Sequence, residues 1–107
     1  MVTFYFTVNA SFLNSNSRYI TVPRGQIDYA RLEEELEDDT ELVIICPNGE
    51  RLSGYMHSGN AGFGPFYQIR AHGFEGDPLS SLEFGQRLVV EIKRAHEEVQ
   101  VRIKIDH

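Results

Sequence analysis

Short segments in which apolar and polar residues alternate constrain the fold of this chain more than any other feature of its sequence. The pattern is clearest in two runs, residues 88–92 and 99–105, where apolar side chains occupy every second position. A period of two is typical of strands that bury one face. Residues 95–98 separate the runs and turn the chain. We therefore predict a terminal hairpin with one solvent-exposed face.

Five further segments have the composition of strands. They are residues 2–8, 19–22, 42–45, 50–56 and 66–70. Pro23 ends the second of them, because proline has no N–H to donate to a neighbouring strand. Asn48 and Gly49 both accept positive φ readily, which predicts a type I′ turn between the third and fourth segments. With the terminal hairpin, the chain has seven predicted strands.

One segment has the pattern of a helix. Asp28 is placed to cap its N-terminus, and Tyr29, Leu32 and Leu36 follow at spacings of three and four, which puts them on one face. The opposite face is acidic. Carboxylates at the C-terminal end of a helix oppose its dipole, so we expect this helix to end near Glu37.

The remaining segments are predicted loops. Asn9–Ser17 is rich in residues whose side chains bond to nearby backbone, and His57–Pro65 has three glycines in nine residues. We expect both to be flexible. A connection at 71–81 and a turn at 82–85 precede the terminal hairpin.

The chain of 107 residues has the size of one domain, spanning residues 1–107. Strands that follow one another along the chain favour antiparallel pairing. We predict a mostly β fold with one helix (α+β), in which about seven short, mainly antiparallel strands form an open barrel or pseudobarrel.

The charge is unevenly distributed. The formal net charge is −6, but residues 28–41 hold eight of the sixteen carboxylates and only one base, Arg31. The rest of the chain has eight acids and nine bases, and eight of the ten bases overall are arginine, which suits bidentate contact with phosphate or carboxylate. We expect one acidic face, most simply a solvated helix surface, and a mildly basic remainder.

The sequence argues against catalysis and cofactors. Cys46, the single cysteine, lies in an apolar run, which excludes an intrachain disulfide and predicts a buried thiol. The four histidines are scattered, with no pair at metal-ligand spacing, and no nucleophile motif is present. We therefore expect no enzyme activity, no metal and no cofactor.

The setting that we expect is cytoplasmic and reducing. The single cysteine fits such a compartment. No apolar run is long enough to cross a membrane, and residues 1–10 lack the pattern of a secretion signal.

The run GNAGFG at 59–64 is similar to phosphate-binding loops but has the wrong context. A dinucleotide-binding loop follows a strand and opens a helix, whereas Pro65 and a predicted strand follow here. We interpret the run as a flexible connection whose glycines allow the backbone to approach a polar ligand.

Several segments together resemble one known family. They are RYITVP at 18–23 before the helix, the Asn48-Gly49 hairpin, FYQIR at 66–70 and LEFGQRLVVEI at 82–92. In this order they resemble the DNA-binding pseudobarrel of plant transcription factors and of restriction-endonuclease effector domains. Gln86 stands where that family usually has an acidic residue. The resemblance extends from about Val2 to Ile105.

The resemblance implies that two loops bind double-stranded DNA from either side. On this chain they are the loop Asn9–Arg18 and the loop His57–Pro65, and their Asn and Ser side chains suit base-edge and phosphate contacts. The candidate DNA-binding residues are Asn14, Asn16, Ser17, Arg18, Arg24, His57, Ser58 and Asn60. Because these loops have few basic residues, the implied binding is weak and strongly salt-sensitive.

The alternative function is that of a protein interaction module. The acidic helix, represented by Glu33, Glu34, Glu37 and Asp38, suits a basic protein partner. An exposed edge strand would also allow pairing with another chain or a homodimer.

Overall fold

The computed structural model describes residues 1–14, 19–72 and 82–106 of the chain. The strands are β1 (Val2–Thr7), β2 (Ile20–Thr21), β3 (Glu41–Ile45), β4 (Arg51–Ala61), β5 (Gly64–Ala71), β6 (Arg87–Ala95) and β7 (Glu98–Ile105), and the helices are α1 (Ala10–Asn14) and α2 (Tyr29–Leu36). No helix in these ranges is long and apolar enough to cross a membrane.

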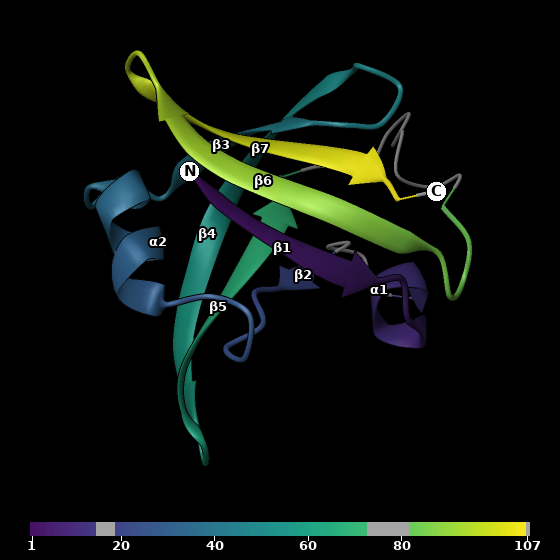
Figure 1. The fold of residues 1–107 in the computed structure, drawn as a ribbon, viewed down its shortest axis with the longest axis horizontal. Coiled ribbons are helices and arrows are strands. Elements are labelled where there is room, and N and C mark those ends of the chain that lie inside the picture. The colour runs from purple at the N-terminus through teal and green to yellow at the C-terminus, as the bar shows by residue number, and fades with distance from the viewer. Residues whose placement is uncertain (15–18, 73–81, 107) are drawn as a thin grey trace.

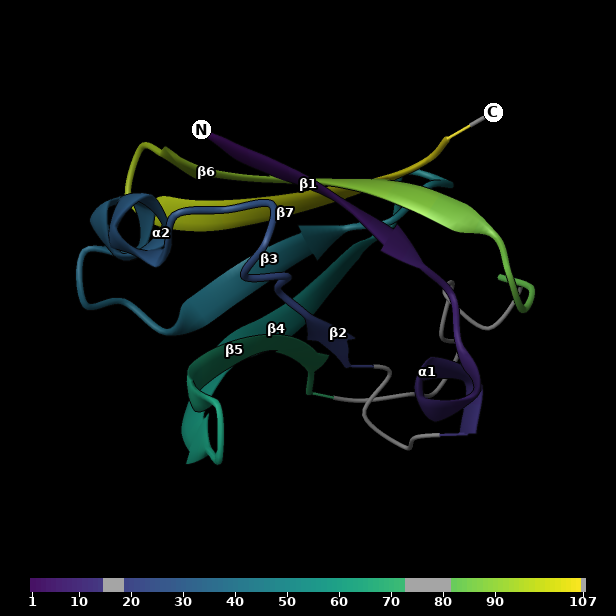
Figure 2. The same ribbon diagram turned by 60° about the horizontal axis from the view of Figure 1, so that its bottom comes forward.

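All seven strands belong to one sheet, with the order β1-β6-β7-β3-β4-β5-β2. Five of the neighbouring pairs are antiparallel, and β3 and β7 are parallel. The sheet curls into a nearly closed barrel (Figures 1 and 2), with a seam between its edge strands β1 and β2. The predicted fold class is confirmed: the protein is mostly β, with mainly antiparallel strands in an open barrel.

The core fills the barrel as the alternation predicts. Leu88, Val90 and Ile92 of β6 are all fully buried, and every second residue of β7 from Val99 to Ile103 joins them. Cys46 is buried as well, with 3% of its surface exposed. No polar or charged side chain of the described residues is buried. Burial of apolar surface is therefore the main stabilising contribution here.

Helix α2 follows its sequence signals closely. The Asp28 side chain accepts a hydrogen bond from the Ala30 N–H at 3.0 Å, and Leu32 and Leu36 are buried. Glu37 and Asp38, at φ 49° and 67°, turn the chain away after the last turn. The Arg94 guanidinium of β6 donates to the carbonyls of Glu35, at 3.1 Å, and of Leu36. This cation stabilises the C-terminal end of the helix, where a positive charge is favourable.

The expectation of a single helix is wrong, because α1 lies within the segment predicted as a loop. Asn9 caps it, with its side chain accepting a hydrogen bond from the Phe12 N–H at 2.9 Å. The Phe12 side chain is fully buried and packs on Phe6, with ring centroids 5.8 Å apart. Burial of this aromatic ring stabilises a helix that its polar neighbours do not favour alone.

The hairpin between β3 and β4 is confirmed, but its turn is not type I′. That turn needs positive φ at both central residues, and of Asn48 and Gly49 only Gly49 has it, at 89°. The Gly49 N–H donates to the Cys46 carbonyl at 2.8 Å, so the tight turn begins at Cys46. Gly49 then provides the left-handed residue that leads into β4.

The predicted loop His57–Pro65 is wrong: it forms the outer part of a second hairpin, between β4 and β5. Strand pairing continues from Gly54 opposite Ala71 to Ala61 opposite Gly64, which leaves two residues at the tip. A Cβ on Gly59 would lie 2.7 Å from the ring of Phe66, its partner across the ladder. Gly59 therefore makes room for an aromatic side chain, and its presence does not indicate a loop.

Side chains of residues 23–28 bridge the seam of the barrel. The Gln26 amide accepts from the Tyr5 N–H at 2.9 Å and donates to the Tyr5 carbonyl at 3.3 Å, as a neighbouring strand would. On the other side, the Arg24 guanidinium donates to the carbonyls of Phe63, at 2.7 Å, and Pro65. The segment thus connects β1 to the β4–β5 hairpin without strand pairing.

Candidate nucleic-acid interface

The structure describes only part of the predicted DNA-binding set. Asn16, Ser17 and Arg18 lie outside the described residues, and Asn14 is the last residue of α1. Arg24 lies in the seam. The other three candidates, His57, Ser58 and Asn60, are on β4.

The three candidates on β4 do not share a face. Ser58 and Asn60 are on the same side of the strand as the buried Met56, whereas His57 points to the opposite side. Because the candidates separate in this way, no single ligand surface includes all of them. Two surfaces must be considered, one on each side of the β4–β5 hairpin.

The first surface is the outer side of β2, β5 and β4, here called the outer face. Directly paired residues share a side of a sheet, and the register pairs Thr21 and His57 with Gln68, and Tyr55 with Arg70. The outer face consists of Thr21, Tyr55, His57, Phe66, Gln68 and Arg70, with Tyr19 and His72 at its margin.

A row of polar groups crosses the outer face. The Arg70 guanidinium donates to the Gln68 side-chain oxygen from Nε at 3.2 Å and from Nη2 at 2.6 Å. The Gln68 side-chain nitrogen lies 3.4 Å from the Thr21 hydroxyl. These contacts orient an arginine, an amide and a hydroxyl side by side across two strands. Each retains hydrogen-bonding capacity toward a ligand.

Aromatic rings flank this row. The Arg70 guanidinium lies over the ring of Tyr19, 5.9 Å from its centroid. The rings of His57 and Phe66 are 6.0 Å apart, and those of Tyr55 and His72 are 4.9 Å apart. The aromatic side chains are partly exposed and restrict the movement of the polar groups between them.

The start of β2 and the tip of the β4–β5 hairpin lie at opposite ends of the outer face. Because β2 is antiparallel to β5, with Ile20 opposite Ile69, the start of β2 lies beside the end of β5. The chain that follows the first predicted loop therefore enters at that end. The tip of the β4–β5 hairpin, which carries the exposed Phe63, lies at the other end (Figure 1).

The second surface is an acidic pocket of about 380 Å³ on the inner side of the same hairpin. Its lining includes the carboxylates of Glu33, Asp38 and Asp39 and the hydroxyls of Thr40, Ser58 and Tyr67. The Tyr67 hydroxyl donates to Glu33 at 2.6 Å, and this hydrogen bond, together with burial, raises the pKa of Tyr67 to about 12. Ser58 thus lies among carboxylates, which is unfavourable for a phosphate contact.

The acidic residues predicted for a protein partner are also divided. Glu33 and Asp38 line the acidic pocket. Glu37 forms an ion pair with Arg94 at 3.3 Å, and Glu34 is exposed on α2. Only part of the acidic run is therefore gathered at one site.

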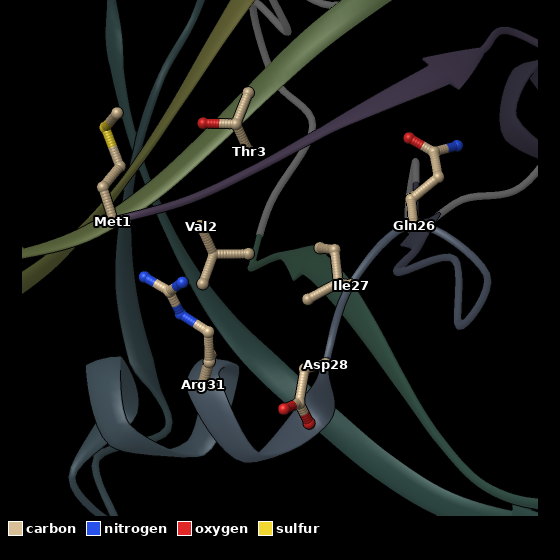
Figure 3. Close-up of a pocket in the computed structure, with 7 residues that line it drawn as sticks. All are labelled: Met1, Val2, Thr3, Gln26, Ile27, Asp28 and Arg31. Carbon is tan, nitrogen blue, oxygen red and sulfur yellow. The ribbon is translucent and has the colours of Figure 1, made fainter.

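A third concavity lies along the edge of β1 (Figure 3). It has a volume of about 250 Å³, and Thr3, Gln26, Asp28 and Arg31 contribute to its lining. The backbone groups of Thr3 face the same edge as those of Tyr5, where Gln26 already occupies the hydrogen-bonding positions. Gln26 therefore interrupts strand addition along this edge at Tyr5.

Compared with models of protein families and with curated proteins, the chain has no significant match.

Sequence reasoning missed most of the outer face. Gln68 and Arg70 belong to the predicted strand FYQIR and are not among the candidate DNA-binding residues, although the alternation in this strand places them together, opposite the buried Ile69. That alternation was a usable signal. Tyr55 and His57 were harder to assign, because their side of the sheet depends on the pairing of β4 beyond the glycines.

Proposed function

We propose that this protein is a non-enzymatic domain that binds double-stranded DNA on the outer face, with the two predicted loops on either side of the duplex. The observation that carries the proposal is the Arg70–Gln68–Thr21 row. Arginine and glutamine are the side chains that read guanine and adenine edges in the major groove. Because Nε and Nη2 of Arg70 are bonded to the Gln68 oxygen, the groups that would contact a base are Nη1 of Arg70 and the remaining side-chain N–H of Gln68. Here the two are adjacent and held in a common orientation on a regular sheet.

The charge distribution supports this choice of surface. Among the described residues, the outer face and its margin contain Arg70 and two histidines, and the carboxylate of Glu41 adjoins them, since Glu41 pairs with Tyr55 from β3 and lies 3.1 Å from His72. The acidic pocket opens on the other side of the hairpin. A duplex on the outer face therefore avoids most of the acidic run. With so few cations, affinity should still decline steeply as salt is raised.

The test is a fluorescence-anisotropy titration with a randomised duplex pool at low and at near-physiological salt. We expect Arg70→Ala to weaken binding about tenfold, because a base contact by arginine contributes roughly 1–3 kcal/mol. Arg102→Ala is the matched control, since Arg102 is an exposed arginine on β7, away from the outer face. Binding that is undetectable at low salt, or equal losses in both variants, would contradict the proposal.

A basic protein partner is the second candidate function, favoured by one observation. The acidic pocket combines three carboxylates and three hydroxyls in a volume that accommodates a lysine or arginine side chain. Such groups would bind an ammonium or guanidinium through charge-assisted hydrogen bonds. This function predicts that Arg70→Ala has no effect on partner binding, which separates it from the first candidate.

A further inference from the structure

Arg24 makes more contacts with the β4–β5 hairpin than a solvated arginine would. Its Nη1 donates to the Phe63 carbonyl at 2.7 Å, and its Nη2 donates to the Pro65 carbonyl. The guanidinium lies over the ring of Phe63, 5.3 Å from the centroid, and over that of Tyr29 at 5.7 Å. The cation therefore bridges the hairpin tip and the start of α2.

Gly64 makes this approach possible. A Cβ at position 64 would lie 2.8 Å from Arg24 Nη2 and 3.3 Å from Nη1, so the guanidinium occupies the space of the missing side chain. The backbone of Gly64 also has φ 116°, which residues with a Cβ rarely adopt. Two independent constraints thus favour glycine at the position where Arg24 contacts the hairpin.

The hairpin needs an additional support at this place. Pairing between β2 and β5 covers only Ile20 and Thr21, and one further bond joins the Val22 N–H to the Tyr67 carbonyl. Beyond Tyr67 the hairpin continues as two strands alone, and an unsupported two-stranded ribbon is marginally stable. Arg24 binds two carbonyls of this outer part, Phe63 and Pro65.

We infer that Arg24 is a positioning residue, which holds the outer part of the β4–β5 hairpin, residues 59–66, at a defined angle to the rest of the sheet. Its guanidinium donates hydrogen bonds to carbonyls of the hairpin that the N–H groups of a neighbouring strand would otherwise reach. The rings of Phe63 and Tyr29 restrict the movement of the guanidinium. This role differs from the phosphate contact that the sequence suggests for Arg24. We call the support of the hairpin by the Arg24 hydrogen bonds to Phe63 and Pro65 the brace. An effect of the brace on DNA affinity rests on the proposed function, whereas the brace itself does not.

The first arm of the test uses the free protein. Amide hydrogen exchange is measured over residues 59–66 in the wild type and in the variants Arg24→Ala, Arg24→Lys, Gly64→Ala and Gly62→Ala. Lysine keeps the charge but has no planar fork for two carbonyls. Gly62→Ala is the matched control, because a Cβ there meets nothing within 4 Å. We expect about tenfold faster exchange in all variants except Gly62→Ala, which corresponds to the loss of one or two hydrogen bonds.

A double variant separates the brace from strain at Gly64. Gly64→Ala also strains its own backbone, so its effect is compared in the wild type and in the Arg24→Ala background. We expect a smaller effect in the second case, because the brace is already lost. Additive effects, or unchanged exchange in Arg24→Ala, would overturn the inference whatever DNA binding shows.

The second arm measures DNA affinity against salt. A phosphate contact by Arg24 predicts that Arg24→Ala lowers the slope of log affinity against log salt by about one and that Arg24→Lys preserves the slope. Bracing predicts reduced affinity with an unchanged slope in Arg24→Ala, Arg24→Lys and Gly64→Ala. A reduced slope confined to Arg24→Ala overturns the positioning role. If the wild type binds no DNA, the proposed function fails, and the first arm alone decides on the brace.

Discussion

At the scale of single residues, the hydrogen bond between Tyr67 and Glu33 has a directly measurable consequence. The Tyr67 hydroxyl holds its proton against the Glu33 carboxylate, which raises the Tyr67 pKa from 10.0 to about 12. The Tyr67 phenol keeps its proton to a higher pH in the folded protein than in the unfolded chain. The protonated phenol therefore stabilises the fold, and this contribution is complete below pH 10. This contribution is lost as the pH rises through the interval from 10 to 12.

We predict that Glu33→Gln lowers the Tyr67 pKa toward its ordinary value, because the amide accepts a weaker hydrogen bond from the hydroxyl than the carboxylate does and no longer repels the phenolate. The measurement is a titration of tyrosinate absorbance, with Tyr67→Phe to identify the Tyr67 transition. Glu34→Gln is the control, since Glu34 is exposed on the same helix. A late transition that persists unchanged in Glu33→Gln would show that burial, and not this bond, is the cause.

At the scale of elements, the edge of β1 is protected by a side chain instead of a strand. Gln26 pairs with both backbone groups of Tyr5, at 2.9 and 3.3 Å. Unpaired edge strands readily join other chains, so this contact limits the pairing that the sequence suggested as a route to a homodimer.

We predict that Gln26→Ala lowers the free energy of unfolding by about 1 kcal/mol and promotes self-association through the exposed edge. Urea unfolding and sedimentation velocity at several protein concentrations measure the two effects. Gln26→Glu serves for comparison, because its carboxylate still accepts from the Tyr5 N–H but cannot donate to the carbonyl. A Gln26→Ala variant that remains monomeric would show that other features protect this edge.

At the scale of the whole molecule, the β4–β5 hairpin separates two surfaces of different charge. The acidic pocket lies on its inner side, and the outer face with Arg70 lies on the other. The two candidate functions therefore respond in opposite ways to a change in the acidic charge, because carboxylates repel DNA at long range but attract a basic partner at short range.

We predict that the double variant Glu34→Gln, Asp38→Asn strengthens DNA binding about two- to threefold at low salt, through reduced repulsion. Asparagine suits position 38, where φ is 67°. The variant is compared with wild type in the anisotropy titration and in a titration with a lysine-rich peptide. Loss of peptide binding without any change in DNA binding would favour the protein-partner function.

The elements of this fold were largely predictable from local signals. Alternation and strand-like composition identified all seven strands, the Asp28 cap and the spacing of Leu32 and Leu36 identified α2, and Cys46 was correctly expected to be buried. These signals depend on residues a few positions apart, so they can be recognised from the sequence alone. The segment of α1 has a capping residue, Asn9, but it is too short for a repeated apolar spacing, and its stability depends on the burial of Phe12.

Tertiary structure alone decided the pairing of distant segments and, with it, the composition of each surface. Gly59 belongs to a strand because Phe66 lies opposite, β3 runs parallel to β7, and Arg24 binds the hairpin rather than solvent. Each of these outcomes depends on a contact partner distant along the chain or across a turn. The sequence determined which residues alternate, cap and turn; the packing of the barrel decided which of them meet, because that choice minimises the energy of the whole fold and not of any one segment.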